Sequence, residues 1–300
     1  MRGEHRFSTT ETAVQHHEQT GIAQKPYAVI RPPVGWASLE LFDLWNYRYL
    51  IWMLLWRDIK GRYRQTMLGP LWFVILPLIR MGVFSLILGL VAGLPSEGVP
   101  YPLYTYAALL PWELFAGAVV RSTGSLVEYM QVISKVYFPR LIVPVTTSLA
   151  GLADFGISFF ILIIMTLAYG YPLTIRLLYV PLLLIPTVML SMAIGMFLSA
   201  LQVRYRDVGQ VVGITIQLWF YATPAAYSAQ LVMDRLPASM QFLYWLNPMA
   251  WVVDGTRWAV IGVGRAPDIN LVIMTVIILF LLIGAAFFFR RTEQSIVDIL

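Results

Sequence analysis

Long apolar segments alternate with short polar connections along most of this chain. A helix needs about 20 mostly apolar residues to cross the hydrocarbon core of a bilayer. Six segments come close to that length, at about 71–93, 103–120, 143–170, 177–201, 210–227 and 270–289. The third is long enough to tilt or to begin with an interfacial turn. The pattern predicts an all-α membrane protein with six transmembrane helices, within one membrane domain over about 46–300.

A shorter apolar piece, residues 50–56, precedes the first span and is too short to cross a membrane. On a helix, apolar residues here recur every three or four positions, and the cations share a different face. The apolar stripe comprises Trp52, Leu55, Trp56, Ile59 and Tyr63. We expect an amphipathic helix in the membrane interface, anchored among anionic lipid headgroups by Arg57, Lys60, Arg62 and Arg64. Anchoring alone explains the basic cluster, and a further role in docking a partner stays open.

Two connections between spans are longer than a simple turn requires. Residues 121–142 have an apolar helical stripe, which predicts a short amphipathic helix with a docking surface. The stripe consists of Leu126, Met130, Ile133 and Tyr137. Residues 228–268 are too interrupted by proline and glycine to cross the membrane twice, yet too apolar for free solvent. We expect two short re-entrant helices there, facing outward between spans five and six; an eight-span topology is the alternative.

The composition agrees with lipid as the solvent for most of the chain. Of the 300 residues, 59% are hydrophobic and 12% are charged, and the mean hydropathy is +0.71. Soluble domains carry roughly 25% charged residues. The net charge of +5 is explained by basic residues at the membrane borders, so nucleic acid is not an expected partner. The chain has no cysteine, which excludes disulfides, a thiol nucleophile and cysteine-based zinc sites.

Lysine and arginine are distributed unevenly between the two sides of the predicted membrane. Eleven lie on one side, and only Arg176, Arg235, Arg257 and Arg265 lie on the other. The richer side is expected to face the cytoplasm, together with both termini. Residues 1–25 lack an apolar core long enough for a cleaved signal peptide. We expect a polar cytoplasmic tail over residues 1–45, in part without fixed structure.

Ionisable residues at bilayer depth are costly, so each is a functional candidate. Arg80, Glu113 and Asp154 lie within the predicted spans. Arg80 is about nine residues into the first span, roughly 13 Å deep at 1.5 Å per residue. It either meets an anionic or hydroxyl-rich passenger, or pairs with Glu113 or Asp154 to hold helices together. Asp154 fits the structural role better than a proton-carrying one, and Glu113 is expected near the outer boundary.

Aromatic residues gather in or beside the first, second and fifth spans. Interfacial belts explain many of them. Flat rings also stack on the faces of sugars, so a wide path lined with rings would let a sugar polymer slide. The residues expected along such a path are Trp72, Phe73, Arg80, Tyr104, Trp112, Glu113, Trp219 and Tyr221.

Motifs for catalysis and nucleotide binding are absent from the sequence. No histidine, cysteine or paired carboxylate lies where a membrane enzyme would need acid–base groups. The phosphate-binding pattern G-x-x-x-x-G-K-[ST] is missing as well. No inverted repeat with paired broken helices, the usual mark of a secondary transporter, is visible. We expect this chain to be neither an enzyme nor a holder of a metal or cofactor.

Six stretches, in order from about residue 50 towards the C-terminus, together resemble the permease subunit of polysaccharide and polyol-phosphate ABC exporters, of the ABC-2 class. They are RDIKGRYRQTMLGPLWFVILPL, LLPWELFAGAV, SLVEYMQVISKVYFPRLIVPV, LAGLADF, VRYRDVGQVVGITIQLWFYATPAAYS and YWLNPMAWVVDGTRWAVIG. This family exports O-antigen, capsule or teichoic-acid chains. Arg80 and Glu113 depart from its usual pattern.

The resemblance implies a homodimeric pore and two copies of a separate ATPase subunit, which uses ATP and Mg²⁺ in the cytoplasm. It places the ATPase contact on about 126–137, with help from residues 51–66, and two outer gate helices within about 228–262. The coupling residues that it implies are Glu128, Tyr129, Lys135, Tyr137 and Arg140.

The resemblance favours the membrane subunit of an exporter that moves a polyprenyl-linked polysaccharide, of O-antigen type, across the bacterial inner membrane. Two other interpretations stay open. One is a membrane-integral glycosyl- or acyltransferase that acts on lipid-linked sugar. The other is an ABC-2 exporter of small lipids or drugs.

Overall fold

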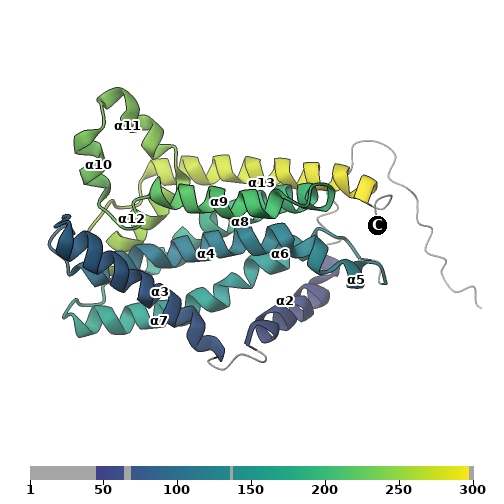
Figure 1. The fold of residues 1–300 in the computed structure, drawn as a ribbon, viewed down its shortest axis with the longest axis horizontal. Coiled ribbons are helices and arrows are strands. Elements are labelled where there is room, and N and C mark those ends of the chain that lie inside the picture. Colours follow the sequence, from purple (N-terminus) through teal and green to yellow (C-terminus); the bar gives the residue numbers. More distant parts are fainter. Residues whose placement is uncertain (1–44, 64–68, 136–137, 297–300) are drawn as a thin grey trace, which may run out of the picture. The chain divides into compact units, whose positions relative to one another are not determined.

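Helices joined by turns and short loops make up the described part of the chain, residues 45–63, 69–135 and 138–296, in this computed structural model (Figure 1). No strand occurs in these ranges, so the prediction of an all-α protein is confirmed. Nearly all of the predicted tail lies outside them, as do Arg64 and Tyr137.

Five stretches in this part of the chain are apolar and long enough to cross a membrane, and they match predicted spans one to four and six. In order, they contain α3 (Trp72–Phe84) with the π-helical η2 (Ser85–Val91), α4 (Tyr101–Glu128), α6 (Ile142–Leu149) with α7 (Gly151–Ala168), η3 (Ile175–Leu178) with α8 (Tyr179–Arg204), and α13 (Ile269–Ile296). The predicted fifth span forms α9 (Val208–Tyr221), an apolar helix of 14 residues. It rises about 21 Å, less than the ~30 Å hydrocarbon core.

Helix α4 is the central element of the described fold and is buried over most of its length (Figure 1). It packs against α3, α6, α7, α8, α9 and α12. The approach to α8 is so close that a Cβ atom on Gly195 would overlap the side chain of Ser122. Three buried hydroxyls near the end of α4 are accommodated because they donate to backbone carbonyls, as Ser122 Oγ does to Pro144 O at 3.0 Å.

Helix α4 also extends further than the hydrophobic pattern predicts. The predicted span ends near residue 120, but the helix continues to Glu128 and includes the first part of the predicted connection. Only a four-residue helix, α5 (Met130–Ile133), follows before Pro139. The extension is possible because Ser122, Thr123 and Ser125 bond to backbone carbonyls and are buried.

Helix α2 (Arg48–Tyr63) forms where the amphipathic helix is predicted. Leu54 is buried against the rest of the protein in a cluster that includes Tyr129 and Phe138. Trp52 and Trp56, from the predicted apolar stripe, are exposed. The helix therefore has one apolar surface that packs against the protein and a second, aromatic surface that is free to contact lipid.

Three helices, rather than the two predicted, lie between α9 and α13. They are α10 (Ala229–Arg235), α11 (Ala238–Trp245) and α12 (Pro248–Ile261). In Figure 1, α10 and α11 project from the end of the bundle opposite to α5. Helix α12 is almost completely buried against α4 and α8. The Asn247 side chain caps its N-terminus by accepting from Met249 N at 3.1 Å.

The contact between Gly195 and Ser122 leads to a stability prediction. We expect Gly195→Val to destabilise the protein by about 1–3 kcal/mol, because the added carbons force α4 and α8 apart. Gly284→Val is the matched control, since nothing lies within 4 Å of a Cβ atom on Gly284. Thermal unfolding in detergent would measure both. Equal melting temperatures for the two variants would contradict the close α4–α8 contact.

Candidate functional site: a groove lined by charges and aromatic rings

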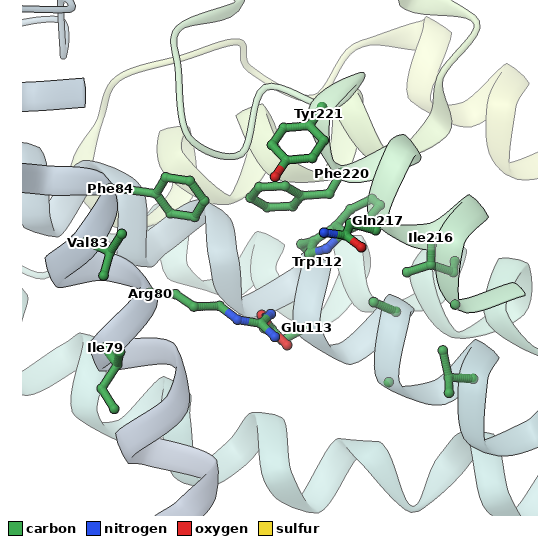
Figure 2. Close-up of a pocket in the computed structure, with 14 residues that line it drawn as sticks. Ile79, Arg80, Val83, Phe84, Trp112, Glu113, Ile216, Gln217, Phe220 and Tyr221 are labelled. Carbon is green, nitrogen blue, oxygen red and sulfur yellow. The ribbon is translucent and has the colours of Figure 1, made fainter. Parts of the chain in front are cut away.

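A groove of about 620 Å³ lies between α3, α4 and α9 (Figure 2). These helices correspond to the first, second and fifth predicted spans. Its lining consists of Ile79, Arg80, Val83 and Phe84 from α3, Trp112, Glu113, Ala116, Gly117 and Val120 from α4, and Gly213, Ile216, Gln217, Phe220 and Tyr221 from α9. The groove thus brings apolar, aromatic and charged groups from three distant parts of the sequence to one surface.

Arg80 and Glu113 form an ion pair within the groove. Figure 2 shows the two side chains extending towards each other from α3 and α4. Of the two carboxylates that the sequence offered as partners for Arg80, Glu113 and Asp154, the structure places Glu113 in contact with it. The Arg80 side chain is 53% exposed and that of Glu113 is 30% exposed. The pair joins two helices and also stays accessible from the groove.

Aromatic rings lie next to this pair. The ring of Phe220 is 5.5 Å from those of Phe84 and Trp112, measured between centroids. Tyr221, which is largely exposed, lies 5.5 Å from Phe220. Phe84 and Gln217 were not among the residues predicted for a path. Both could have been found from the sequence, because residues four apart share a helix face. Phe84 lies four residues after Arg80, and Gln217 lies four residues before Tyr221.

Four of the eight residues predicted for a path line the groove: Arg80, Trp112, Glu113 and Tyr221. Trp72 is exposed near the start of α3, and the side chain of Phe73 is outside the described part. Trp219 points towards a separate cavity of about 300 Å³ between α8 and α9, and donates to Asn247 Oδ1 at 2.9 Å. Tyr104 is fully buried elsewhere and does not line the groove.

A second, smaller cavity of about 200 Å³ adjoins the groove and shares Glu113 and Gly117 with it. Its other charged residues are Arg121 and Asp154. Asp154 forms an ion pair with Arg62 of α2, and lies 4.0 Å from Arg121 Nη2. The prediction of a structural role for Asp154 agrees with these contacts. Arg62 was expected among lipid headgroups, but the structure turns it inward because it pairs with this carboxylate.

Further contacts connect α2 to the end of α4. Tyr129 OH donates to Asp58 Oδ1, and the Arg57 guanidinium lies 4.0 Å from the centre of the Tyr129 ring. Burial raises the pKa of the Asp58 carboxyl, while Arg57 and Arg62 act in the opposite direction. Lys60 is exposed, as the anchoring role requires. Tyr129, predicted to contact a partner, is instead buried between α2 and α4.

The remaining residues predicted for coupling lie at or after the end of α4. Glu128 and Lys135 are exposed. Arg140 contacts α13 instead: its backbone N–H donates to Glu293 Oε1 at 3.3 Å, and its Nη1 donates to Glu293 O at 3.4 Å. The end of α4 and helix α5 therefore offer an exposed charged surface, whereas Arg140 holds the chain against α13.

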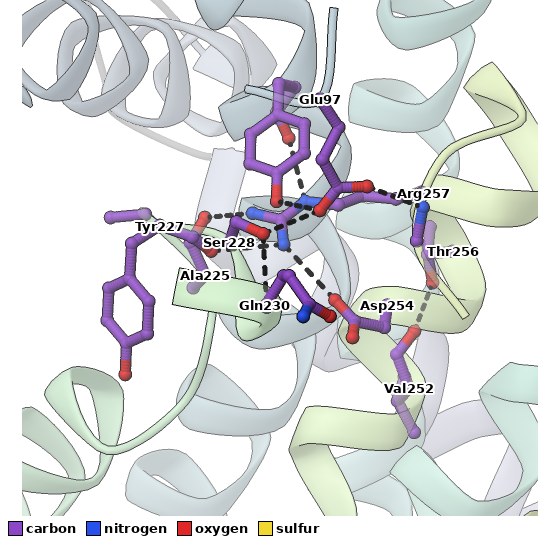
Figure 3. Close-up of polar contacts among 12 residues, drawn as sticks. Glu97, Ala225, Tyr227, Ser228, Gln230, Val252, Asp254, Thr256 and Arg257 are labelled. Atoms are coloured by element: carbon purple, nitrogen blue, oxygen red, sulfur yellow. Dashed lines mark hydrogen bonds and ion pairs between the residues drawn. The ribbon is translucent and has the colours of Figure 1, made fainter. Parts of the chain in front are cut away.

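A third group of charges, the Arg257 cluster, lies at the end of the bundle that carries α10 and α11. Arg257 is 0% exposed. Its guanidinium donates to the carbonyls of Tyr104, Ala225 and Tyr227 at 3.0–3.3 Å, and to Asp254 Oδ1 at 3.3 Å (Figure 3). The same group lies 3.7 Å from the centre of the Tyr104 ring. The cluster consists of Arg257, Asp254, Tyr104, Glu97 and Ser228.

Glu97 bonds to two other members of this cluster and to the segment that follows α12. Its Oε1 accepts from Ser228 Oγ at 2.7 Å and from Tyr104 OH at 3.3 Å, and its Oε2 accepts from Gly264 N at 3.0 Å. The cluster thereby fixes the segment that leaves α9, and so the end of the groove that holds Phe220 and Tyr221. Arg257 was counted among residues of an outer loop, but is buried because α12 packs against α4. The sequence did indicate this burial, because Arg257 lies in an apolar run and follows Asp254 by three residues, close enough to pair with it on a helix.

Removal of the buried guanidinium should be costly. We expect Arg257→Met to destabilise the protein by about 3–5 kcal/mol, because Asp254 and three carbonyls lose their donor in a buried site. The control Arg235→Met changes an exposed residue of α10 and should cost less than about 0.5 kcal/mol. Thermal unfolding in detergent would measure both. A melting temperature for Arg257→Met equal to that of the control would contradict the role of the cluster.

No group of three or more histidine, cysteine, aspartate or glutamate side chains suited to a metal ion occurs in the described ranges. The charged groups of the groove and of its neighbouring cavity are instead paired with one another. The arrangement is therefore suited to non-covalent contact with a molecule in the groove.

Comparison with known proteins gives consistent results. The family model for the ABC-2 type transporter matches residues 49–261. The O-antigen export system permease protein RfbA of Myxococcus xanthus is 27% identical, over 84% of this chain and 96% of that protein. The protein of the same name from Klebsiella pneumoniae is 27% identical over 67% of this chain and 76% of its own length. The family match covers more than half of a chain with several membrane-spanning helices, so this multi-pass membrane protein belongs to the ABC-2 type transporter family.

Proposed function

We propose that this chain is the membrane subunit of an ATP-driven exporter that moves a lipid-linked polysaccharide of O-antigen type out of the bacterial cytoplasm, across the inner membrane. The observation that carries the proposal is the ABC-2 match together with relatives named as O-antigen export permeases. The groove supports it, because rings and paired charges provide stacking surfaces and hydrogen-bonding groups for sugars.

In the proposed assembly, two copies of the chain place their grooves towards a shared path. Helix α9 serves as a short fifth crossing, which makes six, and α10 to α12 form the outward region that includes re-entrant helices. Both termini then lie in the cytoplasm. Two copies of a separate ATPase subunit supply the energy from ATP with Mg²⁺. This chain holds no nucleotide in the proposal.

The proposed path runs along Arg80, Glu113, Trp112 and Tyr221 in the groove, and Trp72 contributes near its cytoplasmic entrance; Phe73 stays a prediction. Rings of this kind contact sugar faces without requiring one orientation, so successive sugar units can pass. Tyr104 and Trp219 do not line the path in this proposal but stabilise the helices around it. Tyr104 contacts Arg257, and Trp219 donates to Asn247 at the start of α12.

A test of transport follows from Gly213, which lines the groove with nothing within 4 Å of a Cβ atom. We expect Gly213→Trp to lower surface display of the polymer by at least about tenfold, because the indole fills the groove. Gly284→Trp adds the same side chain to open space on α13 and should leave export near the wild-type level. Display would be measured in cells that lack the native gene and carry each variant.

Two results would contradict the proposed function. One is unchanged polymer display after deletion of the gene. The other is glycosyl- or acyltransferase turnover by the purified chain without a partner. If Gly213→Trp exported as well as Gly284→Trp, the groove would not be the path, although the chain could still be required for export.

We further propose that the exposed end of α4 and helix α5 form the ATPase contact. Glu128 and Lys135 are exposed there, and the neighbouring Tyr129 bonds to Asp58 of α2. A movement of this end would be transmitted in two directions, along α4 to Glu113 and across to α2. Arg140 is left out of this surface because it contacts Glu293, and Tyr137, outside the described residues, stays a prediction.

Charge reversal should separate ATP hydrolysis from export. We expect Glu128→Lys and Lys135→Glu each to lower polymer display while the ATPase subunits still hydrolyse ATP, because like charges then face each other across the contact. Arg140→Glu is less informative, since it also breaks the contact with Glu293. Arg235→Glu on α10 is the control. Normal export by both charge reversals would remove the contact from this surface.

A further inference from the structure

We infer that the Arg80–Glu113 pair makes the groove selective for electrically neutral, hydroxyl-rich sugars over sugars that carry carboxylate or phosphate groups. This inference rests on the proposed function and adds the substrate class. It concerns two residues from different helices that the structure brings together in the groove.

The pair offers both donors and an acceptor to the groove. Its contact uses one guanidinium nitrogen, Nη1, and one carboxylate oxygen, Oε1. Within residues 45–63, 69–135 and 138–296, no other hydrogen bond is formed by either side chain. Nε and Nη2 of Arg80, and Oε2 of Glu113, therefore remain for a ligand. Gln217 adds an amide, which both donates and accepts, to the same lining.

A neutral sugar fits this combination. Each hydroxyl both donates and accepts, so two neighbouring hydroxyls can accept from Arg80 and donate to Glu113 without an unpaired group. The apolar face of the sugar ring can then lie against Phe220, which lines the same groove and is partly exposed. Stacking surfaces and a mixed set of donors and acceptors thus occur at one place.

An anionic sugar fits less well. Arg80 and Glu113 carry opposite unit charges, so the pair presents no net charge, and among the described residues no other charged side chain lines the groove. A carboxylate or phosphate that reached Arg80 would come close to the Glu113 carboxylate, in a site where Glu113 is only partly exposed to water. Like charges at short distance repel strongly in such a setting. Selectivity arises from this repulsion as much as from attraction to the neutral sugar.

The sign of the selectivity should change when Glu113 is neutralised. The exporter complex with its ATPase subunit, in nanodiscs, would be titrated with a neutral probe, maltoheptaose, and an anionic probe, heptagalacturonate. We expect the wild type to bind maltoheptaose more tightly by about tenfold, and Glu113→Gln to reverse the order, because Arg80 then lacks its counter-charge. Asp268→Asn removes a carboxylate from the exposed pair with Arg265, outside the groove, and should keep the wild-type order.

A second variant keeps the pair intact. Gln217→Arg adds a positive charge to the same lining and should also shift binding towards the anionic probe. It provides the same test if Glu113→Gln does not yield folded protein. The double variant Arg80→Gln with Glu113→Gln restores zero charge and should again favour the neutral probe.

Equal binding of the two probes by the wild type, absence of maltoheptaose binding, or an order unchanged in both Glu113→Gln and Gln217→Arg would overturn the inference. Absence of binding is the result expected if the second copy of the chain covers the pair. Polymer display in cells separates this inference from the proposed function. Chain-dependent display without probe selectivity would refute the selectivity alone, whereas display that does not require the chain would refute the function.

Discussion

This membrane protein depends on one constraint: charged side chains within its apolar helical bundle must be paired. A charged side chain at the centre of a membrane costs about 2.5–3.5 kcal/mol or more when alone. The described structure offsets that cost by pairing charges: Arg80 with Glu113 and Arg62 with Asp154 join different helices, whereas Arg257 and Asp254 lie one turn apart on α12. The first two pairs join separate helices, and the Arg257 guanidinium bonds to backbone carbonyls of other segments, so the charges act as specific contacts in a largely apolar protein.

These pairs differ in how much they are exposed, and this difference assigns them different roles. Arg257 is sealed among backbone carbonyls and holds the segment between α9 and α10 in place. Arg80 and Glu113 remain accessible from the groove. A buried pair is rigid and stabilises the wall of a path, whereas an accessible pair can exchange partners with a passing molecule.

Helix α4 connects the groove to the end of the bundle where α2 and α5 lie. Glu113, Gly117 and Arg121 are four residues apart and therefore share one face of this helix, which borders both cavities. The same helix ends beside Tyr129, which contacts α2. Because a packed helix moves largely as a rod, this arrangement provides a direct mechanical connection between the proposed ATPase contact and the groove.

The sequence by itself determined the helical class, five of the crossing segments and the place of the short helix α2, because apolar periodicity is local and lipid demands it. It also identified Arg80, Glu113 and Asp154 as costly charges, but their partners lie 33 and 92 residues away. Tertiary packing alone decided those partners, the burial of Arg257 and Tyr104, the inward turn of Arg62 and the extra length of α4. Such contacts depend on which helix faces meet, and that is set by the combined shapes of segments far apart in the chain.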